Sequence, residues 1–294
     1  MHSTLLRRHA PATDRPNGHV SRFQDAVTQG LPLGRIGNLV VRLATGEDEV
    51  EIAQQVRYRV FHEEMRAASD ARAADRRDAD RFDAVCDHLL VIDTGLPGSL
   101  AERVVGTYRL LREEMAVASG GFYSSDEFEL GSLVRRQRGH RFLELGRSCV
   151  LPGYRSKRTI EVLWQGIWAY VNHYRIGVMA GCASFPGTVP AAHAAALSLL
   201  AHNFRAEPEW DVRALPHRHV PLDLMPAEAI DAKAALGAMP PLIKGYLRLG
   251  ARVGDGCVVD HEFGTTDVFM ILPVATISQR YINYYGAEAE RFRA

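Results

Sequence analysis

The chain lacks the features that mark several large classes of protein. Its four cysteines lie far apart and include no Cys-x-x-Cys pair, so we expect reduced, packed thiols rather than a disulfide framework or a zinc site. No run approaches about 18 consecutive apolar residues, so no segment is expected to cross a bilayer. The N-terminus has no long apolar run either, so we expect no secretory signal and a cytoplasmic location.

A formal net charge of zero also removes any overall preference for an acidic partner such as nucleic acid. What is present suits a packed core, because 47% of the residues are hydrophobic and 24% are charged. Residues 1–35 contain several prolines and glycines without periodicity and are predicted to form a flexible N-terminal arm. Residues 36–294 are predicted to form a single domain.

The most informative stretch is residues 142–174. It begins as an apolar strand that carries Glu144 and Arg147, although a charge in a buried strand is costly unless it is paired or used. A Pro-Gly turn and a basic loop follow, and then a helix with apolar residues every three or four positions. The free N–H groups of a helix N-terminus suit a phosphate. The basic residues beside that terminus are Arg155, Lys157 and Arg158.

The rest of the chain alternates between strand and helix patterns. Strands are predicted over 36–43, 88–93, 104–111, 177–184 and 267–274, and helices over 47–64, 189–204 and 240–253. The Ala-, Arg- and Asp-rich segment 67–83 is predicted to be mobile, and 119–130 irregular. The order β-α-β-β-β-α-β-α-α-β predicts an α/β (α+β) fold with a largely antiparallel first half.

Six motifs in this order resemble the ornithine N-acyltransferases, the acyl-carrier-protein-dependent branch of the GNAT acyltransferases that makes lyso-ornithine lipid. The motifs begin at Arg57, Asp80, Val105, Phe122, Glu144 and Gly181. The acyl-homoserine-lactone synthases share a sparser set of these residues, which here are Arg57, Phe61, Asp80, Asp83, Arg109, Glu144 and Arg147. The resemblance implies a GNAT-like fold, a mixed and mostly antiparallel sheet flanked by helices, in which residues 205–294 extend the sheet and the acyl pocket.

This resemblance also implies a reaction and its partners. A 3-hydroxyacyl group would pass from acyl carrier protein to the α-amine of L-ornithine, with the acyl-phosphopantetheine thioester as co-substrate and no permanently bound cofactor or metal. The loop after the central strand lacks the repeated glycines that wrap the pyrophosphate of coenzyme A, which favours a carrier protein as donor. Its residues Arg155, Lys157 and Arg158 would then bind the phosphopantetheine and its acidic carrier.

Acyl transfer to an amine needs a proton acceptor, a stabilised thioester oxygen and aligned partners. Glu144 is the first candidate for the base; the alternative is a structural ion pair with Arg147 or Arg109. A backbone N–H near Ser148 or Cys149 would serve the thioester oxygen. The catalytic set expected from the resemblance is therefore Glu144, Arg147 and Ser148.

The other family positions suggest contacts to ornithine. Arg109 or Arg147 suits its carboxylate, and Asp80 with Asp83 suits its side-chain ammonium, although a solvated acidic face is the simpler interpretation of those aspartates. Arg57 would either clamp the substrate or brace the neighbouring segment.

Two other functions stay open. The chain could make an acyl-homoserine lactone from S-adenosylmethionine, or it could be a non-catalytic module that binds lipid or a carrier protein. The amphiphilic product of the first reaction would be compatible with peripheral contact at the inner face of the cytoplasmic membrane.

Overall fold

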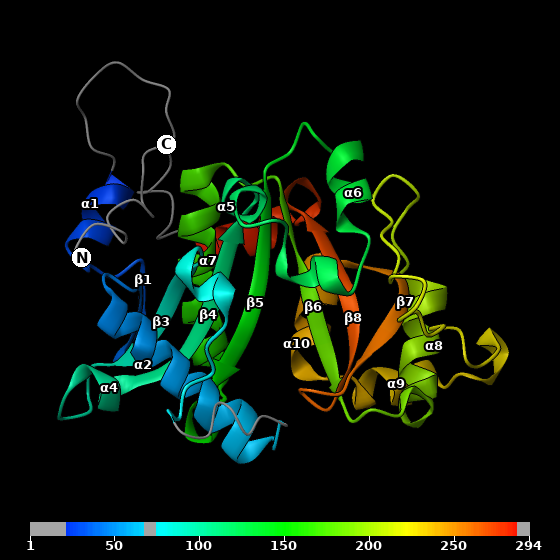
Figure 1. Cartoon of the computed structure of the whole chain (residues 1–294), viewed down its shortest axis with the longest axis horizontal. Coiled ribbons are helices and arrows are strands. Elements are labelled where there is room, and N and C mark those ends of the chain that lie inside the picture. Colours follow the sequence, from blue (N-terminus) through cyan, green and yellow to red (C-terminus); the bar gives the residue numbers. More distant parts are fainter. Residues whose placement is uncertain (1–21, 68–74, 287–294) are drawn as a thin grey trace.

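The computed structural model describes residues 22–67 and 75–286, which are built around a mixed sheet of eight strands in the order β1-β2-β3-β4-β5-β6-β8-β7 (Figure 1). Only β5 and β6 pair in parallel; the other neighbours are antiparallel. The strands are β1 Gly34–Ile36, β2 Leu39–Leu43, β3 Asp87–Asp93, β4 Val104–Arg112, β5 Phe142–Val150, β6 Val178–Pro186, β7 Arg252–Asp260 and β8 Thr265–Pro273. The predicted mixed, mostly antiparallel sheet flanked by helices is confirmed.

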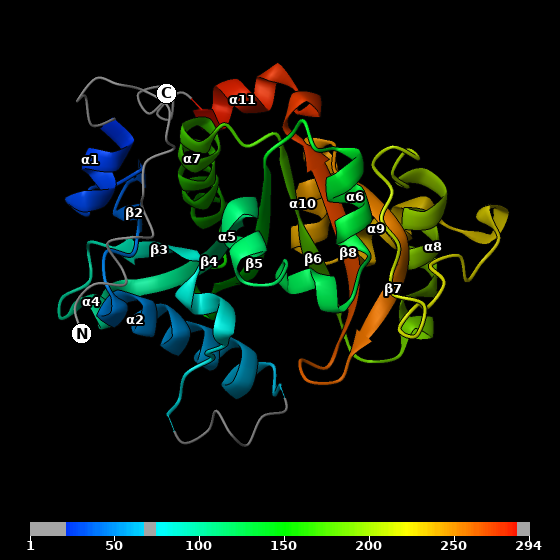
Figure 2. The same ribbon diagram turned by 45° about the horizontal axis from the view of Figure 1, so that its top comes forward.

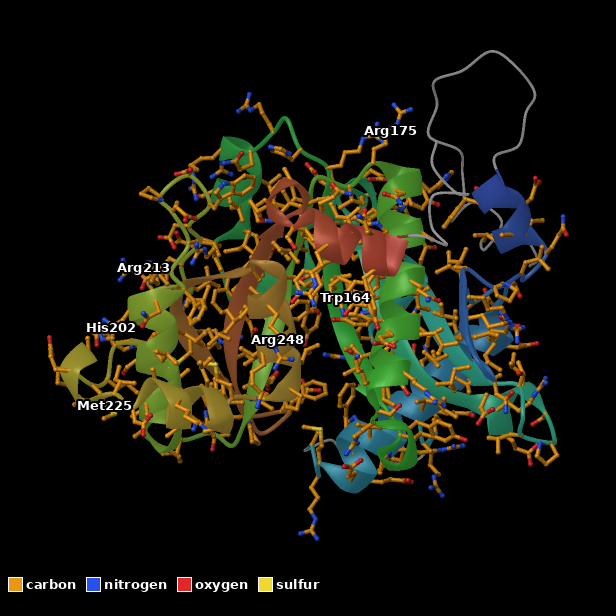
Figure 3. All side chains as sticks on the ribbon, turned by 180° about the vertical axis from the view of Figure 1, so that it is seen from behind. Trp164, Arg175, His202, Arg213, Met225 and Arg248 are labelled. Carbon is orange, nitrogen blue, oxygen red and sulfur yellow. The ribbon has the colours of Figure 1, made fainter. Side chains whose placement is uncertain are left out.

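Helices cover both faces of this sheet. Figure 1 shows α2 and α6 in front of it, whereas Figure 3, seen from behind, shows the helices of the opposite layer. Figure 2 shows α11 beside one end of α7, and the two helices are in contact. The helices are α1 Arg22–Thr28, α2 Glu47–Tyr58, α4 Leu100–Arg103, α5 Glu113–Ala118, α6 Leu130–Arg136, α7 Lys157–Tyr174, α8 Ala194–Asn203, α9 Ala232–Ala238, α10 Pro241–Leu249 and α11 Gln279–Gly286.

The long helix α7 is the main helix behind the sheet. Its apolar residues, spaced three and four apart, are buried against β1, β2 and β3, as the sequence pattern predicts. Ser156 caps the helix by accepting a hydrogen bond from the N–H of Thr159. Gly166 allows a close approach to the sheet, since a Cβ there would lie 2.9 Å from a side-chain atom of Val41. The N-terminus of α7 and its basic loop are thereby held beside the end of β5.

The two central strands separate partway along their length. Residues Phe142–Glu144 of β5 pair with Val178–Ala180 of β6, and beyond these residues the two strands diverge (Figure 1). At the branch, Gly181 has a φ of +156° and passes so close to β5 that a Cβ would lie 2.3 Å from the carbonyl oxygen of Leu145. Only glycine fits this backbone approach. The C-terminal half of β5 therefore has β4 as its neighbour but not β6.

Several predictions of local structure were wrong. Residues 22–35 form α1 and β1 rather than part of a flexible arm, and Phe23 is fully buried with its ring stacked 4.3 Å from that of His173. Residues 1–21 of the predicted arm lie outside the described residues. The predicted mobile segment 67–83 is described only in part, since 68–74 lie outside it; in the described part, Asp78 is 1% exposed and residues 81–84 form a 3₁₀ turn.

The predicted helix over 240–253 ends at Leu249, and β7 follows it at once. Gly250, at a φ of +100°, terminates the helix in the left-handed region. β7 was missed because Gly254, Asp255 and Gly256 interrupt its apolar pattern; they sit where the register between β7 and β8 shifts. The described part of the C-terminal segment, residues 205–286, thus adds two strands to the sheet. None of the helices described is both long and apolar enough to span a membrane.

Candidate active site

The site begins with a bulge in β5. Between Arg109 and Thr107 of β4, the partner strand runs from Gly146 to Cys149 and so carries one extra residue. Arg147 lies in this bulge with a φ of +48°, in the left-handed region. In a regular strand, positions three apart face opposite sides of the sheet. Here the side chains of Glu144 and Arg147 both contact Tyr123, by its backbone N–H and its hydroxyl respectively, so the bulge brings them to one face.

Glu144 binds backbone rather than a guanidinium group. Its two carboxylate oxygens accept the N–H groups of Tyr123 (2.7 Å) and Ser124 (2.8 Å), and the residue is 4% exposed. Burial raises the pKa of Glu144, and these hydrogen bonds oppose the rise. Glu144 makes no salt bridge with Arg147 or Arg109, so the ion-pair alternative was wrong. The residue anchors the turn at 122–126, which consists of the 3₁₀ turn Tyr123–Asp126 and its N-cap Phe122.

The predicted arginines and aspartates form a compact buried network with Asp78, which the sequence did not single out. Arg57 binds Asp78 (3.0 Å) and Asp83 (2.8 Å). Arg109 binds Asp80 (2.7 Å) and Asp83 (3.3 Å). Arg147 binds Asp78 (3.2 Å) and Asp80 (3.3 Å), and its Nη1 donates to the hydroxyl of Tyr123. Three positive and three negative side chains therefore compensate one another.

This network separates the predicted substrate residues into two groups. Asp80 and Arg147 line a cavity, whereas Arg57, Asp83 and Arg109 lie behind it and are at most 5% exposed. Against its burial, the guanidinium groups of Arg57 and Arg109 hold the pKa of Asp83 well below its usual range. The solvated acidic face that was considered for Asp80 and Asp83 was wrong, and the bracing role of Arg57 fits its contacts.

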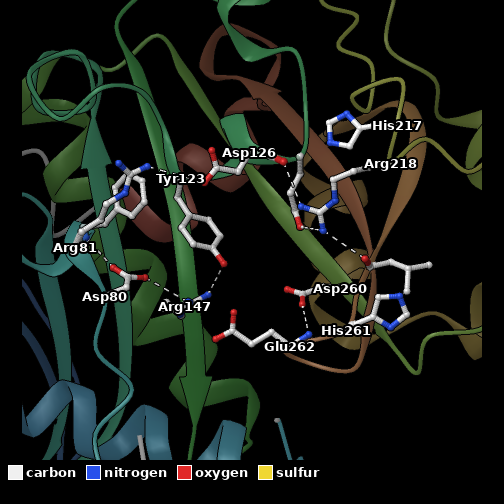
Figure 4. Close-up of a pocket in the computed structure, with 13 residues that line it drawn as sticks. Asp80, Arg81, Tyr123, Asp126, Arg147, His217, Arg218, Asp260, His261 and Glu262 are labelled. Atoms are coloured by element: carbon white, nitrogen blue, oxygen red, sulfur yellow. Dashed lines mark hydrogen bonds and ion pairs between the residues drawn. The ribbon is translucent and has the colours of Figure 1, made fainter. Parts of the chain in front are cut away.

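The cavity beside this network has a volume of about 680 Å³ (Figure 4). In Figure 4, Tyr123 and Arg147 lie on one side, and Arg218, Asp260 and His261 on the other. Charged groups dominate its lining. The carboxylates are Asp80, Asp126, Glu127, Asp260 and Glu262, and the guanidinium groups are Arg81, Arg147 and Arg218.

A cluster of carboxylates that the sequence analysis missed adjoins the cavity, and two of its members, Glu127 and Asp260, line it. Oxygens of Glu127, Asp260 and Asp267 lie within 4.8 Å of one another, and Asp267 is 7% exposed. The sequence signal was present only in that Glu127 and Asp267 fall in stretches that resemble the family; their separation along the chain hides the cluster. The absence of a metal therefore stays a prediction.

The basic loop occupies the surface before α7. Arg155 makes a bidentate ion pair with Glu64, at 2.7 and 2.6 Å, so it braces the loop against the end of the π-helical turn Arg59–Glu64. Lys157 lies 3.4 Å from Glu161, and its side chain is 85% exposed. Arg158 is also exposed. The three predicted cations are thus together, but Arg155 is engaged by a carboxylate of the protein itself.

The remaining candidates lie elsewhere. Ser148 adjoins Tyr108, whose hydroxyl bonds to that of Tyr246 within the core beneath α7. Burial raises the pKa of the Cys149 thiol to about 12, which fits a packed thiol and not a nucleophile. All four cysteines are free. Glu144, Arg147 and Ser148 are therefore neighbours in β5 without sharing one set of contacts.

Comparison with known proteins agrees with this architecture. A family model described as "Acetyltransferase (GNAT) domain" matches residues 56–165. The "L-ornithine N(alpha)-acyltransferase" of Brucella abortus (strain 2308) is 61% identical over 261 residues, which cover 88% of this chain and 93% of that protein. The protein of the same name from Rhizobium meliloti (strain 1021) is 59% identical over 280 residues, covering 95% and 94%.

Solved structures that match the chain are much more distant in sequence. The AHL synthase LasI has a TM-score of 0.46 and 14% identity, with 84% of this chain and 95% of that chain covered. FeeM, an N-acyl amino acid synthase from uncultured soil microbes, has a TM-score of 0.44 and 10% identity, with 81% and 91% covered.

The mixed sheet and the domain match define the class of protein: the chain is an N-acyltransferase with a GNAT fold. Identities of 59–61% across most of both chains define the group within that class. The chain belongs to the L-ornithine N(alpha)-acyltransferase family.

Proposed function

We propose that the chain transfers a 3-hydroxyacyl group from the phosphopantetheine thioester of acyl carrier protein to the α-amine of L-ornithine. The product would be lyso-ornithine lipid, and no cofactor would be bound permanently. The names of the relatives support ornithine as the acceptor. Because the product is an amphiphile, we also propose a cytoplasmic location with transient contact at the inner face of the membrane.

The charge of the cavity carries this proposal. Its lining holds five carboxylates and three guanidinium groups, an excess of negative charge. Ornithine carries two ammonium groups and one carboxylate near neutral pH, so its net positive charge complements that lining. The bonds described above use three of the five N–H donors of Arg147, and the other two suit the substrate carboxylate. Asp80 lies beside Arg147 at the same edge of the cavity.

The acceptor nitrogen would attack the thioester carbonyl next to the bulge of β5. The α-ammonium first gives one proton to water, and the neutral amine then attacks. The new C–N bond forms, the C–S bond breaks, and the second N–H proton passes to the leaving sulfur, so that the carrier departs as a thiol. The bulge leaves an extra residue of β5 outside the ladder of hydrogen bonds with β4. A backbone N–H near Ser148 or Cys149 therefore suits the negative charge that develops on the thioester oxygen.

We assign Glu144 to positioning rather than to direct proton abstraction. Both of its oxygens already accept backbone N–H groups, and it does not line the charged cavity. By holding the turn at 122–126 it places Tyr123 against Arg147. The first proton of the α-ammonium would pass to water in the cavity, and Glu144 would not accept it.

The donor would approach from the N-terminus of α7. Lys157 and Arg158 are exposed there, and free N–H groups of the helix point the same way. A phosphate and an acidic carrier surface would both be attracted to this end. Arg155 contributes less in this proposal, because Glu64 already neutralises it.

One assay tests the proposed function. Purified protein is incubated with 3-hydroxyacyl carrier protein and with L-ornithine, with S-adenosylmethionine, or with neither, and thiol release and product mass are followed. We expect release only with ornithine, with an amide product. Release that depends on S-adenosylmethionine would move the chain to lactone synthesis, and carrier binding without any release would favour a non-catalytic module.

A further inference from the structure

The strands β6, β7 and β8 bring acidic side chains to one face of the sheet. Asp267 pairs with Ser184 of β6 and with Val258 of β7, and Asp260 pairs with Thr265, two residues before Asp267. Residues two apart in a strand face the same side, so Asp260 and Asp267 lie on a common face. Glu127, from the segment after the turn at 122–126, completes the cluster, and oxygens of the three residues lie within 4.8 Å of one another.

Internal partners compensate this cluster only in part. Within residues 22–67 and 75–286, the cation that pairs with Glu127 is Arg218, at a distance of 3.1 Å. The other oxygen of Glu127 accepts the thiol of Cys182 (3.3 Å), and Asp260 accepts two backbone N–H groups. Carboxylates held this close, and mostly out of water, repel one another.

Asp267 has room for a further ligand. It is 7% exposed, and its Oδ1 has no well-formed hydrogen bond within the described part of the chain. The neutral hydroxyls of Ser184 and Thr265 lie near enough to lower the pKa of this carboxyl group, but they bring no positive charge. A buried carboxylate without a cationic partner is costly, so a positively charged donor that enters beside Glu127 and Asp260, which line the cavity, would stabilise Asp267.

The ionisation of the cluster agrees with this interpretation. Burial, with the neighbouring carboxylate of Asp267, raises the pKa of Glu127 to about 7. Burial, opposed by the hydroxyls of Ser184 and Thr265 and aided by the neighbouring Asp260, raises the pKa of Asp267 to about 6. A cation bound between them would lower both pKa values, so binding should release protons near neutral pH.

We propose that Glu127, Asp260 and Asp267 bind the side-chain ammonium of the amino-acid acceptor and so select an acceptor with a second amine. This inference rests on the proposed function and adds to it the residues that recognise the amine that is not acylated. Glu127 and Asp260 line the same cavity as Arg147, so an acceptor can place its carboxylate at the arginine and its ammonium at the cluster. It replaces the predicted ammonium site at Asp80 and Asp83, where arginines already fill that role.

The test compares L-ornithine with L-norvaline, which has the same carbon chain without the second amine. The wild type, Asp267→Asn and Glu127→Gln are assayed with 3-hydroxyacyl carrier protein. Asp223→Asn is the control, because the side chain of Asp223 is 62% exposed and lies outside the cavity. We expect either cluster variant to raise the KM for ornithine about 10- to 100-fold, the range of one charged hydrogen bond, and to leave the KM for norvaline unchanged.

Equal shifts for both amino acids, or a wild type that uses both equally well, would overturn the inference. Circular dichroism checks that each variant is folded, and the two substitutions provide independent tests of one site. Isothermal titration with ornithine alone separates this inference from the proposed reaction. If no acyl transfer occurs, binding that is lost in Asp267→Asn still supports the site, and absence of binding refutes it. Tight binding of Mg²⁺, Ca²⁺ or Mn²⁺ that Asp267→Asn abolishes would instead assign a metal site and overturn the inference.

Discussion

The substitution Asp83→Asn tests whether the buried network is structural or binds substrate. The carboxylate of Asp83 accepts hydrogen bonds from Arg57 (2.8 and 2.9 Å), Arg109 (3.3 Å) and Gln54 (3.1 Å), and the residue is 5% exposed. An asparagine keeps the size of the side chain but removes the charge, and it turns an amide group toward a guanidinium group. Breaking one partner of a buried ion pair typically costs about 3–5 kcal/mol. We expect the free energy of unfolding to fall by that amount.

The pH dependence provides a second signature. The pKa of Asp83 is lower in the folded protein than its ordinary value of 3.8, so the unfolded chain binds this proton more readily. The stabilisation is therefore present above pH 4 and is lost as the pH falls below that value. Asp83→Asn has no such proton to bind, so the difference in stability between the two proteins should shrink as the pH falls from about 5 to about 3.

The assay is urea unfolding followed by circular dichroism at several pH values, with KM for ornithine measured on the same samples. Asp223→Asn serves as a control for an exposed aspartate, with an expected change within about 0.5 kcal/mol. If Asp83→Asn keeps the wild-type stability and raises only the KM for ornithine, the structural interpretation is refuted. The substrate contact that the family resemblance implied would then be correct.

Three other predictions follow from the site. Glu144→Gln should loosen the turn that Glu144 anchors and lower kcat about 10- to 100-fold, consistent with about 1.5–3 kcal/mol for a hydrogen bond to a charged group. Loss of the acidic limb of the pH–rate profile in this variant would instead identify Glu144 as the base. The double variant Lys157→Ala, Arg158→Ala should raise the KM for carrier protein at low salt and not at high salt, with kcat unchanged; a salt-independent effect would contradict it. Asp267→Asn should increase the free energy of unfolding above pH 7 by about 2–3 kcal/mol. The raised pKa of this buried carboxyl group means that the wild type loses stability as the pH rises from about 4 to 6, and the variant does not. Thermal unfolding of both proteins at pH 5 and pH 8 checks the sign.

Local patterns predicted most of the sheet and its main helix. The central strand, α7 and the antiparallel pair β3–β4 appeared where periodicity placed them, because each has one face that must leave water. The missed elements are short, or in β7 interrupted by glycine; they are the strands β1 and β7 and the helices α1, α4, α5, α6, α9 and α11. They are stabilised by tertiary contacts such as the burial of Phe23 beneath α7, which local propensity does not encode.

Family positions pointed to charged residues without revealing their partners. Asp83 and Arg109 were predicted to contact ornithine, and Arg57 either to clamp the substrate or to brace the neighbouring segment; in the structure the three neutralise one another in the interior. A charge in a sequence indicates that a compensating group must exist when the residue is buried; it does not show whether that group belongs to the protein or to a ligand.

Sequence patterns alone predicted the mixed fold, the strand–loop–helix core around β5 and α7, and the class of reaction, because each depends on short-range periodicity or on motifs in a fixed order. Which side chains meet, in contrast, depends on how the sheet is assembled. A single extra residue in β5 turned Arg147 to the face of Glu144, and the register of β7 and β8 joined Asp260 to Asp267. Electrostatic energy depends on distance and burial in space, so residues far apart in the chain acquired their roles only when the sheet was assembled.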